Sequence, residues 1–150
     1  MPESMNEAAL RIGRSVPVFP LSGKVPLVSG GFQAATQDEE EIQTWWSRWA
    51  DAGIGVPTGE ISGFDVLDVD GDEGVESLKQ YEAEHGPVPD TYVVITGRGC
   101  HYYLEHDPEM KNRAGFLPGL DVRGEGGYVV VPPSLHESGE SYRWKGESPW

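Results

Sequence analysis

The sequence predicts an α+β fold in which helices cover one face of an antiparallel sheet. Two segments, 36–49 and 72–85, have the residue spacing of amphipathic helices. The segment 61–70 has apolar side chains on both of its faces, as expected for a strand inside a sheet. Beyond Pro89, short strands alternate with glycine turns, which is typical of antiparallel strands. Together these signals indicate an α+β domain.

The N-terminal segment predicts a short helix and then a strand. Apolar residues from Ala8 to Ile12 indicate the helix, and 16–19 has the composition of a strand broken by prolines. Thr36 with Glu39 three residues later is the signature of a capping box, which starts a second helix. The apolar face of this second helix comprises Ile42, Trp45, Trp46 and Trp49. We interpret that face as core packing, with a base-stacking platform as the alternative.

The middle of the chain predicts two strands and a third helix. The strands are Ile54 to Val56 and Ile61 to Asp70. Asp72 is suited to cap the following helix, which ends at Gly86 before a proline. We interpret the acidic residues at 38–41 and along the third helix as solvated surface.

The last third predicts glycine-rich hairpins. The first joins 92–96 to 101–104 through Gly97 to Cys100, and the second joins 120–122 to 128–131 through 123–127. A further strand is predicted at 142–144.

Composition limits the class of protein. The chain has 150 residues, a net charge of −14 and 37% hydrophobic residues, enough for one domain or two small modules sharing a core. The charge argues against a simple basic nucleic-acid-binding module, although residues 38–90 carry −13 of it and the last third is nearly balanced. No apolar run approaches the ~20 residues of a membrane span, and no signal peptide is evident, so we expect a soluble, cytoplasmic protein. The single Cys100 excludes an internal disulfide and a cysteine-based zinc site.

Two carboxylates at the end of the apolar strand are the first candidate site. Asp68 and Asp70 alternate with Val69 and therefore point to the same side of the strand. Two carboxylates held this close repel each other unless a cation lies between them, and hard oxygen ligands favour Mg²⁺ or Mn²⁺.

This motif has three other interpretations. An EF-hand loop starting at Asp68 would need Gly at position 73 and Glu at position 79, where the chain has Glu73 and Lys79. The segment 66–71 is similar to the DxDG motif of haloacid-dehalogenase phosphatases, but Asp72 and the lack of a late paired-Asp motif depart from that family. In the third interpretation the acids only cap the following helix, which suits Asp72 and leaves Asp70 unexplained.

Other polar residues lie where they could join these carboxylates. His101 begins the strand after the Gly-Arg-Gly turn, and Asp121 lies in another strand directly before a glycine-rich turn. Arg98 and Arg123 could contact phosphate together with the backbone N–H groups of the glycine turns. The remaining histidines, His85, His106 and His136, are by default structural.

The ordered set of motifs resembles the bifunctional primase–polymerase (prim-pol) domain of the archaeo-eukaryotic primase superfamily, found in phage and plasmid replication proteins. The motifs that carry this resemblance are Phe19-Pro20-Leu21, Gly23-Lys24, Pro26, Trp45-Trp46, Thr58-Gly59, Ser62-Gly63, Val66 to Asp70, Thr96 to His101, Gly119 to Gly124, Val131 to Ser134 and His136. The resemblance implies an RNA-recognition-motif-like (RRM-like) catalytic sheet at about 61–150, packed against an N-terminal α/β module at about 1–60.

The same resemblance implies the roles of individual residues. Asp68, Asp70 and Asp121 would bind two Mg²⁺ or Mn²⁺ ions, and His101 would contact the triphosphate of the incoming nucleotide. Secondary candidates for phosphate or template contact are Arg98, Arg123, Ser134, His136 and Lys24.

The implied reaction is template-directed transfer of a nucleotide to a 3′-hydroxyl, with nucleoside triphosphates and a DNA template and primer as partners. We expect a catalytic domain excised from a larger replication protein that also contains a helicase, located in the host cytoplasm if phage-encoded. The alternatives are a metal-dependent phosphohydrolase or nuclease that uses the same carboxylates, and a non-catalytic acidic binding protein such as a DNA mimic.

Overall fold

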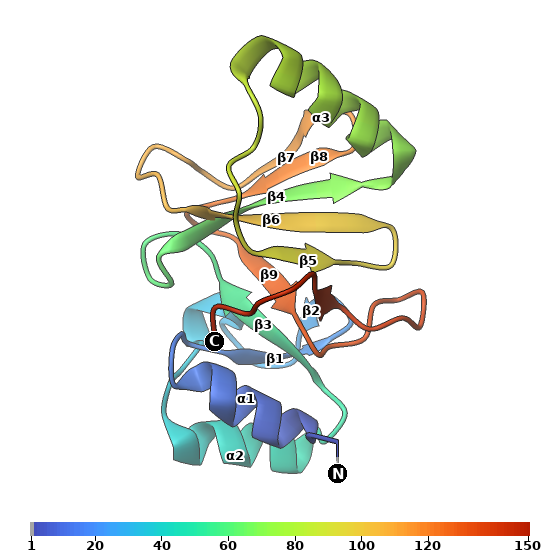
Figure 1. The fold of residues 1–150 in the computed structure, drawn as a ribbon. Coiled ribbons are helices and arrows are strands. Elements are labelled where there is room, and N and C mark those ends of the chain that lie inside the picture. Colours follow the sequence, from blue (N-terminus) through green and yellow to red (C-terminus); the bar gives the residue numbers. More distant parts are fainter. Residues whose placement is uncertain (1) are drawn as a thin grey trace.

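The computed structural model describes residues 2–150 and has four layers (Figure 1). One helix, α3, covers the outer face of a six-stranded sheet, and α1 with α2 covers the outer face of a four-stranded sheet. The strand orders are β10-β5-β6-β4-β8-β7 and β2-β1-β3-β9. Every named strand pair is antiparallel. The α+β prediction is therefore confirmed, with helices on one face of each sheet and the other faces turned toward one another.

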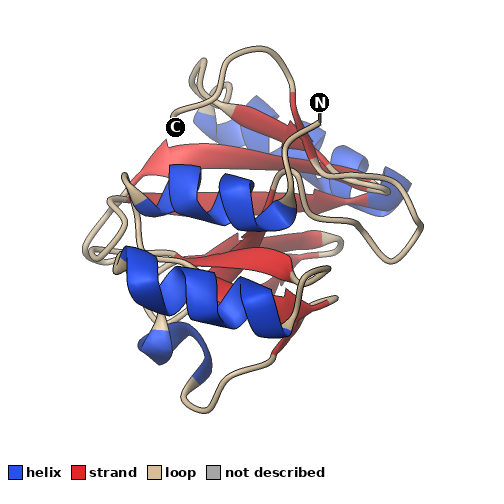
Figure 2. Cartoon of the chain, turned by 90° about the horizontal axis from the view of Figure 1, so that it is seen from below, coloured by secondary structure: helices blue, strands red, loops and turns tan. Residues whose placement is uncertain are grey.

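The four-stranded layer is built mainly from the N-terminal part of the chain. Its elements are α1 (Met5–Gly13), β1 (Phe19–Ser22), β2 (Val25–Pro26), the 3₁₀-helix η1 (Gly31–Ala34), α2 (Glu39–Arg48), β3 (Gly53–Pro57) and β9 (Tyr128–Val131). Seen from below, α1 and α2 lie side by side over the strands (Figure 2). The aromatic face of α2 packs into the core as predicted, because Trp46 is fully buried and its indole N–H donates to the carbonyl of Ala52 at 3.0 Å.

The start of α2 differs from the prediction. The N-cap is Asp38, whose carboxylate accepts from the N–H of Glu40, rather than Thr36. Thr36 cannot cap the helix because its backbone pairs with Val18 in an extended bridge. The same bridge precedes β1, which begins at Phe19.

The six-stranded layer follows from residue 64 onward. Its elements are β4 (Phe64–Asp70), α3 (Gly71–His85), β5 (Val93–Ile95), β6 (Gly99–Glu105), β7 (Arg113–Leu117), β8 (Leu120–Arg123) and β10 (Arg143–Trp144). Both β4 and β5 are antiparallel to β6, which lies between them, so β4, α3 and β5 form a split β-α-β unit. With β8 on the other side of β4, this is the RRM-like arrangement that the resemblance implied. The predicted extra strand at 142–144 is present as β10.

The second predicted hairpin is wrong. β8 pairs with β4 and β7, whereas β9 pairs with β3 in the other sheet. The connection 124–127 therefore crosses from one sheet to the other. The hydroxyl of Thr58 donates to the carbonyl of Gly124 and holds this connection in place. Alternation and glycine content mark strands and turns, but they do not specify which edge a strand joins.

Two boundaries in the middle of the chain also differ. β4 begins at Phe64 because residues 59–63 form a turn in which the N–H of Gly63 donates to the carbonyl of Gly59, leaving Ile61 63% exposed. The N-cap position of α3 belongs to Asp70, which makes no side-chain cap, and Asp72 lies in the first turn.

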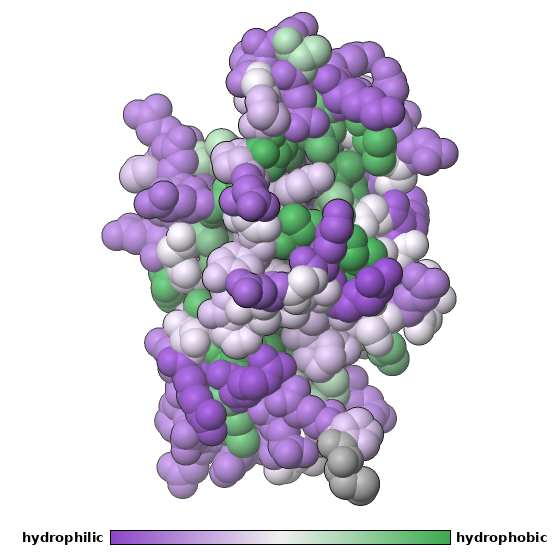
Figure 3. All heavy atoms as spheres, in the orientation of Figure 1, coloured by the Kyte–Doolittle hydropathy of each residue, from purple (hydrophilic) through white to green (hydrophobic). Residues whose placement is uncertain are grey.

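Two apolar clusters hold the layers together. The larger lies between α1, α2 and the two sheets and includes Phe19, Trp46, Val66 and Tyr103. The smaller lies between α3 and its sheet around Val69, Leu78 and Leu120. Hydrophilic side chains cover the outer surfaces of α3 and of the helices at the opposite end (Figure 3), in agreement with the prediction that the acidic runs are solvated. Within residues 2–150, no helix has both the length and the apolar character needed to span a bilayer.

Candidate active site

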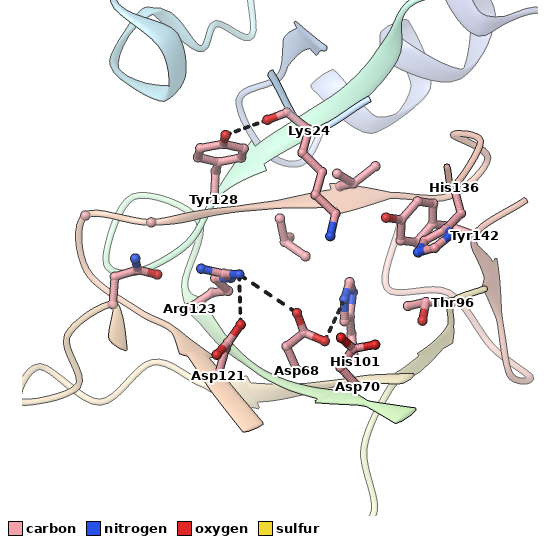
Figure 4. A pocket seen from close by; sticks show the side chains of 15 residues that line it. Lys24, Asp68, Asp70, Thr96, His101, Asp121, Arg123, Tyr128, His136 and Tyr142 are labelled. Carbon is pink, nitrogen blue, oxygen red and sulfur yellow. Dashed lines mark hydrogen bonds and ion pairs between the residues drawn. The ribbon is translucent and has the colours of Figure 1, made fainter. Parts of the chain in front are cut away.

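A cavity of about 230 Å³ opens between the inner face of the six-stranded sheet, β9 and the turn between β1 and β2 (Figure 4). The side of β4 that faces it carries Asp68 and Asp70, while the alternate residues Leu67 and Val69 pack toward α3. The residues lining the cavity are Lys24, Asp68, Asp70, Thr96, His101, Asn112, Asp121, Arg123, Gly126, Gly127, Tyr128, Val129, Val130, His136 and Tyr142.

Three of the predicted residues form one row across the sheet. Asp68 on β4 is the direct register partner of His101 on β6 and of Asp121 on β8. Directly opposed residues of antiparallel strands have Cβ atoms about 4.5–5.5 Å apart, so these side chains emerge together. Strand register, rather than proximity along the chain, therefore assembles the site.

Basic side chains offset the charge of this row. Nη2 of Arg123 lies 3.2 Å from Oδ2 of Asp121 and 3.9 Å from Oδ2 of Asp68, and Nε2 of His101 lies 3.4 Å from Oδ1 of Asp68 (Figure 4). The other carboxylate oxygen of Asp121 accepts from the backbone N–H of Gly115 at 2.7 Å. Burial alone would raise the pKa of Asp68, but His101, Arg123 and Lys24 together hold that pKa below its ordinary value. Asp68 is thus an anion at neutral pH.

Asp70 lies nearer the mouth of the cavity. Its Oδ1 is 3.5 Å from Nε of Arg98, and Nη1 of Arg98 is 3.7 Å from Oε1 of Glu137. The side chains of Arg98 and Asp70 are 61% and 52% exposed, so this ion pair is weak in water and open to exchange with a ligand.

The glycine turn before His101 is shaped by Thr96. The N–H groups of Arg98 and Gly99 donate to Oγ1 of Thr96 at 3.3 and 2.9 Å. These two donors are therefore used within the turn, whereas the sequence predicts that the N–H groups of the turn contact phosphate. Gly97 lies against the 136–138 loop, where an added Cβ would be 2.5 Å from Nδ1 of His136. Only glycine fits this close approach.

Lys24 enters from the opposite wall. Figure 4 shows its side chain extending from the β1–β2 turn toward Asp68. Its carbonyl accepts from the hydroxyl of Tyr128 at 2.6 Å, which fixes the turn to β9. A residue from the four-stranded layer thus completes a site based on the six-stranded sheet.

Of the predicted site residues, Arg98 does not line the cavity, and neither does Ser134. Ser134 is fully buried, and its Oγ accepts from the backbone N–H of Ile54 in β3 at 2.8 Å. Here it ties the 132–136 segment to the four-stranded sheet.

The other two histidines outside the motifs have different surroundings. His106 lies 2.9 Å from the buried carboxylate of Asp65, which also accepts from the N–H of Asp107. His85 lies exposed on α3, 3.8 Å from Glu84.

Sequence reasoning missed four polar side chains of the lining, namely Thr96, Asn112, Tyr128 and Tyr142. Thr96 could have been found, because a Thr hydroxyl at the start of a turn commonly accepts from the backbone N–H two residues later. Tyr142 has no such signal. It is 4% exposed, and its ring lies 5.9 Å from that of His101 and 5.4 Å from that of His136, contacts that only the tertiary fold creates.

The donor chemistry of the cavity suits a hard divalent ion. Asp68, Asp70 and Asp121 supply carboxylate oxygens on one wall, and such oxygens are the preferred ligands of Mg²⁺ and Mn²⁺. In the part of the chain that the structure describes, no three His, Cys, Asp or Glu side chains are close enough to hold a metal as they stand. The guanidinium of Arg123 lies between two of the carboxylates and would have to yield to an ion.

Comparison with known proteins points in the same direction. No curated protein matches the chain. One family model does, that of the bifunctional DNA primase/polymerase N-terminal domain, and its match runs over residues 8–149. This match covers nearly the whole chain, including every residue of the cavity, and the chain therefore belongs to the Prim-Pol family of DNA primase/polymerase domains.

Proposed function

We propose that this domain extends a DNA primer on a template by transferring nucleotides from triphosphates to a 3′-hydroxyl. The observation that carries the proposal is the row of Asp121, Asp68 and His101 in one cavity, flanked by Arg123 and Lys24. The family match supports a primase/polymerase activity at the level of the domain.

The carboxylates Asp68, Asp70 and Asp121 would hold two divalent ions, Mg²⁺ or Mn²⁺. When bound, such ions lower the pKa of an attacking hydroxyl and offset charge on the leaving pyrophosphate. The anionic state of Asp68 and the direct pairing of Asp68 with Asp121 support this assignment.

The remaining side chains would position the triphosphate. Nε2 of His101 faces Asp68, and an imidazole nitrogen beside a carboxylate carries its proton, so His101 presents an N–H at the floor of the cavity. Lys24, Arg98, Arg123 and His136 would bind phosphate oxygens, since phosphoryl transfer depends on placement and electrostatics. Ser134, held by Ile54, would act by anchoring the segment that carries His136.

The net charge of −14 bears on how the domain would bind DNA. A domain this acidic would bind DNA weakly and in a strongly salt-sensitive way. We therefore infer that it works as the catalytic part of a larger phage or plasmid replication protein, alongside a helicase in the cytoplasm of the host.

Primer extension tests the proposal. A labelled primer on a DNA template is incubated with deoxynucleoside triphosphates and Mg²⁺ or Mn²⁺, and product length is read on a gel. We expect Asp68→Asn and Asp121→Asn each to lower the extension rate by at least about 100-fold, because each removes a charge that the reaction needs. Asp90→Asn, on an exposed turn outside the cavity, is the matched control.

Other outcomes would identify the alternatives. Release of phosphate or shortening of the DNA without elongation, abolished by Asp68→Asn, would indicate a phosphohydrolase or nuclease. No metal-dependent nucleotide binding at all would indicate an acidic binding protein. Full extension by both Asn variants would refute the assignment of the site.

A further inference from the structure

The cavity has a second chemical character at the end beyond His101. The row runs from Asp121 through Asp68 to His101, and past His101 the lining changes to Thr96, His136 and Tyr142 (Figure 4). These three residues come from the turn after β5 and from the segment between β9 and β10. Beyond His101, therefore, hydroxyl and imidazole groups line the cavity beside the carboxylate of Asp70.

His136 presents a hydrogen-bond donor at this end. Its Nδ1 accepts from the backbone N–H of Ser138 at 3.0 Å, and a backbone N–H can only donate. The proton of the neutral ring must therefore lie on Nε2. Within residues 2–150 this Nε2–H makes no hydrogen bond, although His136 is only 7% exposed.

Tyr142 and Thr96 add two hydroxyl donors. The Tyr142 ring packs between His101 and His136, and a phenol is protonated at neutral pH, so its hydroxyl can donate. Oγ1 of Thr96 already accepts from two backbone N–H groups, so its hydroxyl hydrogen is what it can donate to a ligand. Neither hydroxyl donates a hydrogen bond within residues 2–150.

We propose that Tyr142, His136 and Thr96 form a subsite for the terminal phosphate of the incoming nucleoside triphosphate. A cluster of donors without acceptors fits an oxygen-rich anion. Lys24 lines the same cavity, and Arg98, two residues after Thr96, pairs with Asp70 and Glu137. The inference rests on the proposed function, which places the attacked phosphate at the carboxylates. The rest of the triphosphate then extends past His101 into the donor end.

Nucleotide binding tests this subsite with variants that change one donor at a time. Tyr142→Phe removes the hydroxyl and keeps the ring packing. His136→Asn keeps an acceptor for the Ser138 N–H at the position of Nδ1 and removes the Nε2–H, whereas His136→Gln keeps a donor near the Nε2 position. Tyr92→Phe, at an exposed tyrosine that packs on Trp144 outside the cavity, is the matched control.

Calorimetry with dATP, dADP and inorganic tripolyphosphate, each with Mg²⁺, gives the readout. Wild type should bind dATP more tightly than dADP. Tyr142→Phe and His136→Asn should each weaken dATP and tripolyphosphate binding about tenfold and leave dADP unchanged, because one hydrogen bond to a charged group is lost. His136→Gln should retain more dATP affinity than His136→Asn, and Tyr92→Phe should match wild type.

The opposite results separate two failures. If wild type binds dATP and dADP equally, or if Tyr142→Phe weakens both equally, the subsite is refuted while the polymerase proposal stands. If wild type binds none of the three probes, the proposed function fails and the subsite fails with it. Melting temperatures near that of wild type exclude misfolding as the cause of a loss.

Discussion

Replacing Ser134 with alanine distinguishes an anchoring role from a phosphate-binding role. The Ser134 hydroxyl is buried and accepts from the N–H of Ile54 at 2.8 Å, and Ile54 faces Pro20 of β1. Ser134→Ala leaves that N–H without a partner inside the protein, which costs about 1–3 kcal/mol. For a domain of this size each kcal/mol lowers the melting temperature by about 2–4 °C, so we expect a decrease of about 2–12 °C.

The assay pairs thermal unfolding with dATP titration in the presence of Mg²⁺. The buried position predicts a destabilised protein whose nucleotide affinity at 15 °C, well below its melting transition, is within about twofold of wild type. Ser29→Ala, at an exposed turn, should change neither quantity. A variant that melts like wild type but binds dATP more than tenfold more weakly would refute the reasoning, and would place the Ser134 hydroxyl in contact with phosphate.

Two further predictions concern contacts around the cavity. The hydrogen bond to Asp65, reinforced by Glu125 and Glu60, raises the pKa of folded His106, so the folded state holds its proton more tightly and the free energy of unfolding should fall as pH rises above about 6.5 through the folded pKa. His106→Asn, which can donate but cannot titrate, should flatten that dependence in urea unfolding between pH 6 and 9, and an unchanged slope would contradict it. Gly97→Ala places a methyl group 2.5 Å from Nδ1 of His136 and should cost about 1–3 kcal/mol of stability and weaken dATP binding. If Gly97→Ala has the melting temperature and the dATP affinity of wild type, the contact between Gly97 and His136 is not tightly packed.

Local patterns in the sequence predicted most of the elements. The Trp-bearing helix, the two-sided strand ending in Asp70 and the 92–104 hairpin all appear in the structure. Boundaries shifted where backbone pairing overrode side-chain signals, as where the bridge between Val18 and Thr36 delays the start of α2. The failed hairpin has a similar cause, since the pairing of β9 with β3 joins residues more than 70 positions apart, a choice that no local pattern encodes.

The site residues also separate into those that the sequence could predict and those that it could not. Asp68 and Asp70 could be placed together from the sequence because they end an apolar strand, and a strand exposes alternate residues to one side. His101 and Asp121 were candidates through their positions beside glycine turns and through the family resemblance. Tyr142 was not predictable, because its position beside His101 depends on where β10 joins the sheet. Ser134 lies in a motif segment, yet burial turns its hydroxyl toward Ile54.

The sequence by itself determined the α+β class, the strand that carries Asp68 and Asp70, and the chemistry available to the protein. These follow from periodicity and side-chain type, which act over a few residues. Only the tertiary structure decided that Asp121, Asp68 and His101 form one row, that Lys24 and β9 close the cavity from the other sheet, and that Tyr142 and His136 line its far end. The physical reason is that register and sheet-to-sheet packing minimise the free energy of the whole core, and no short segment contains that information.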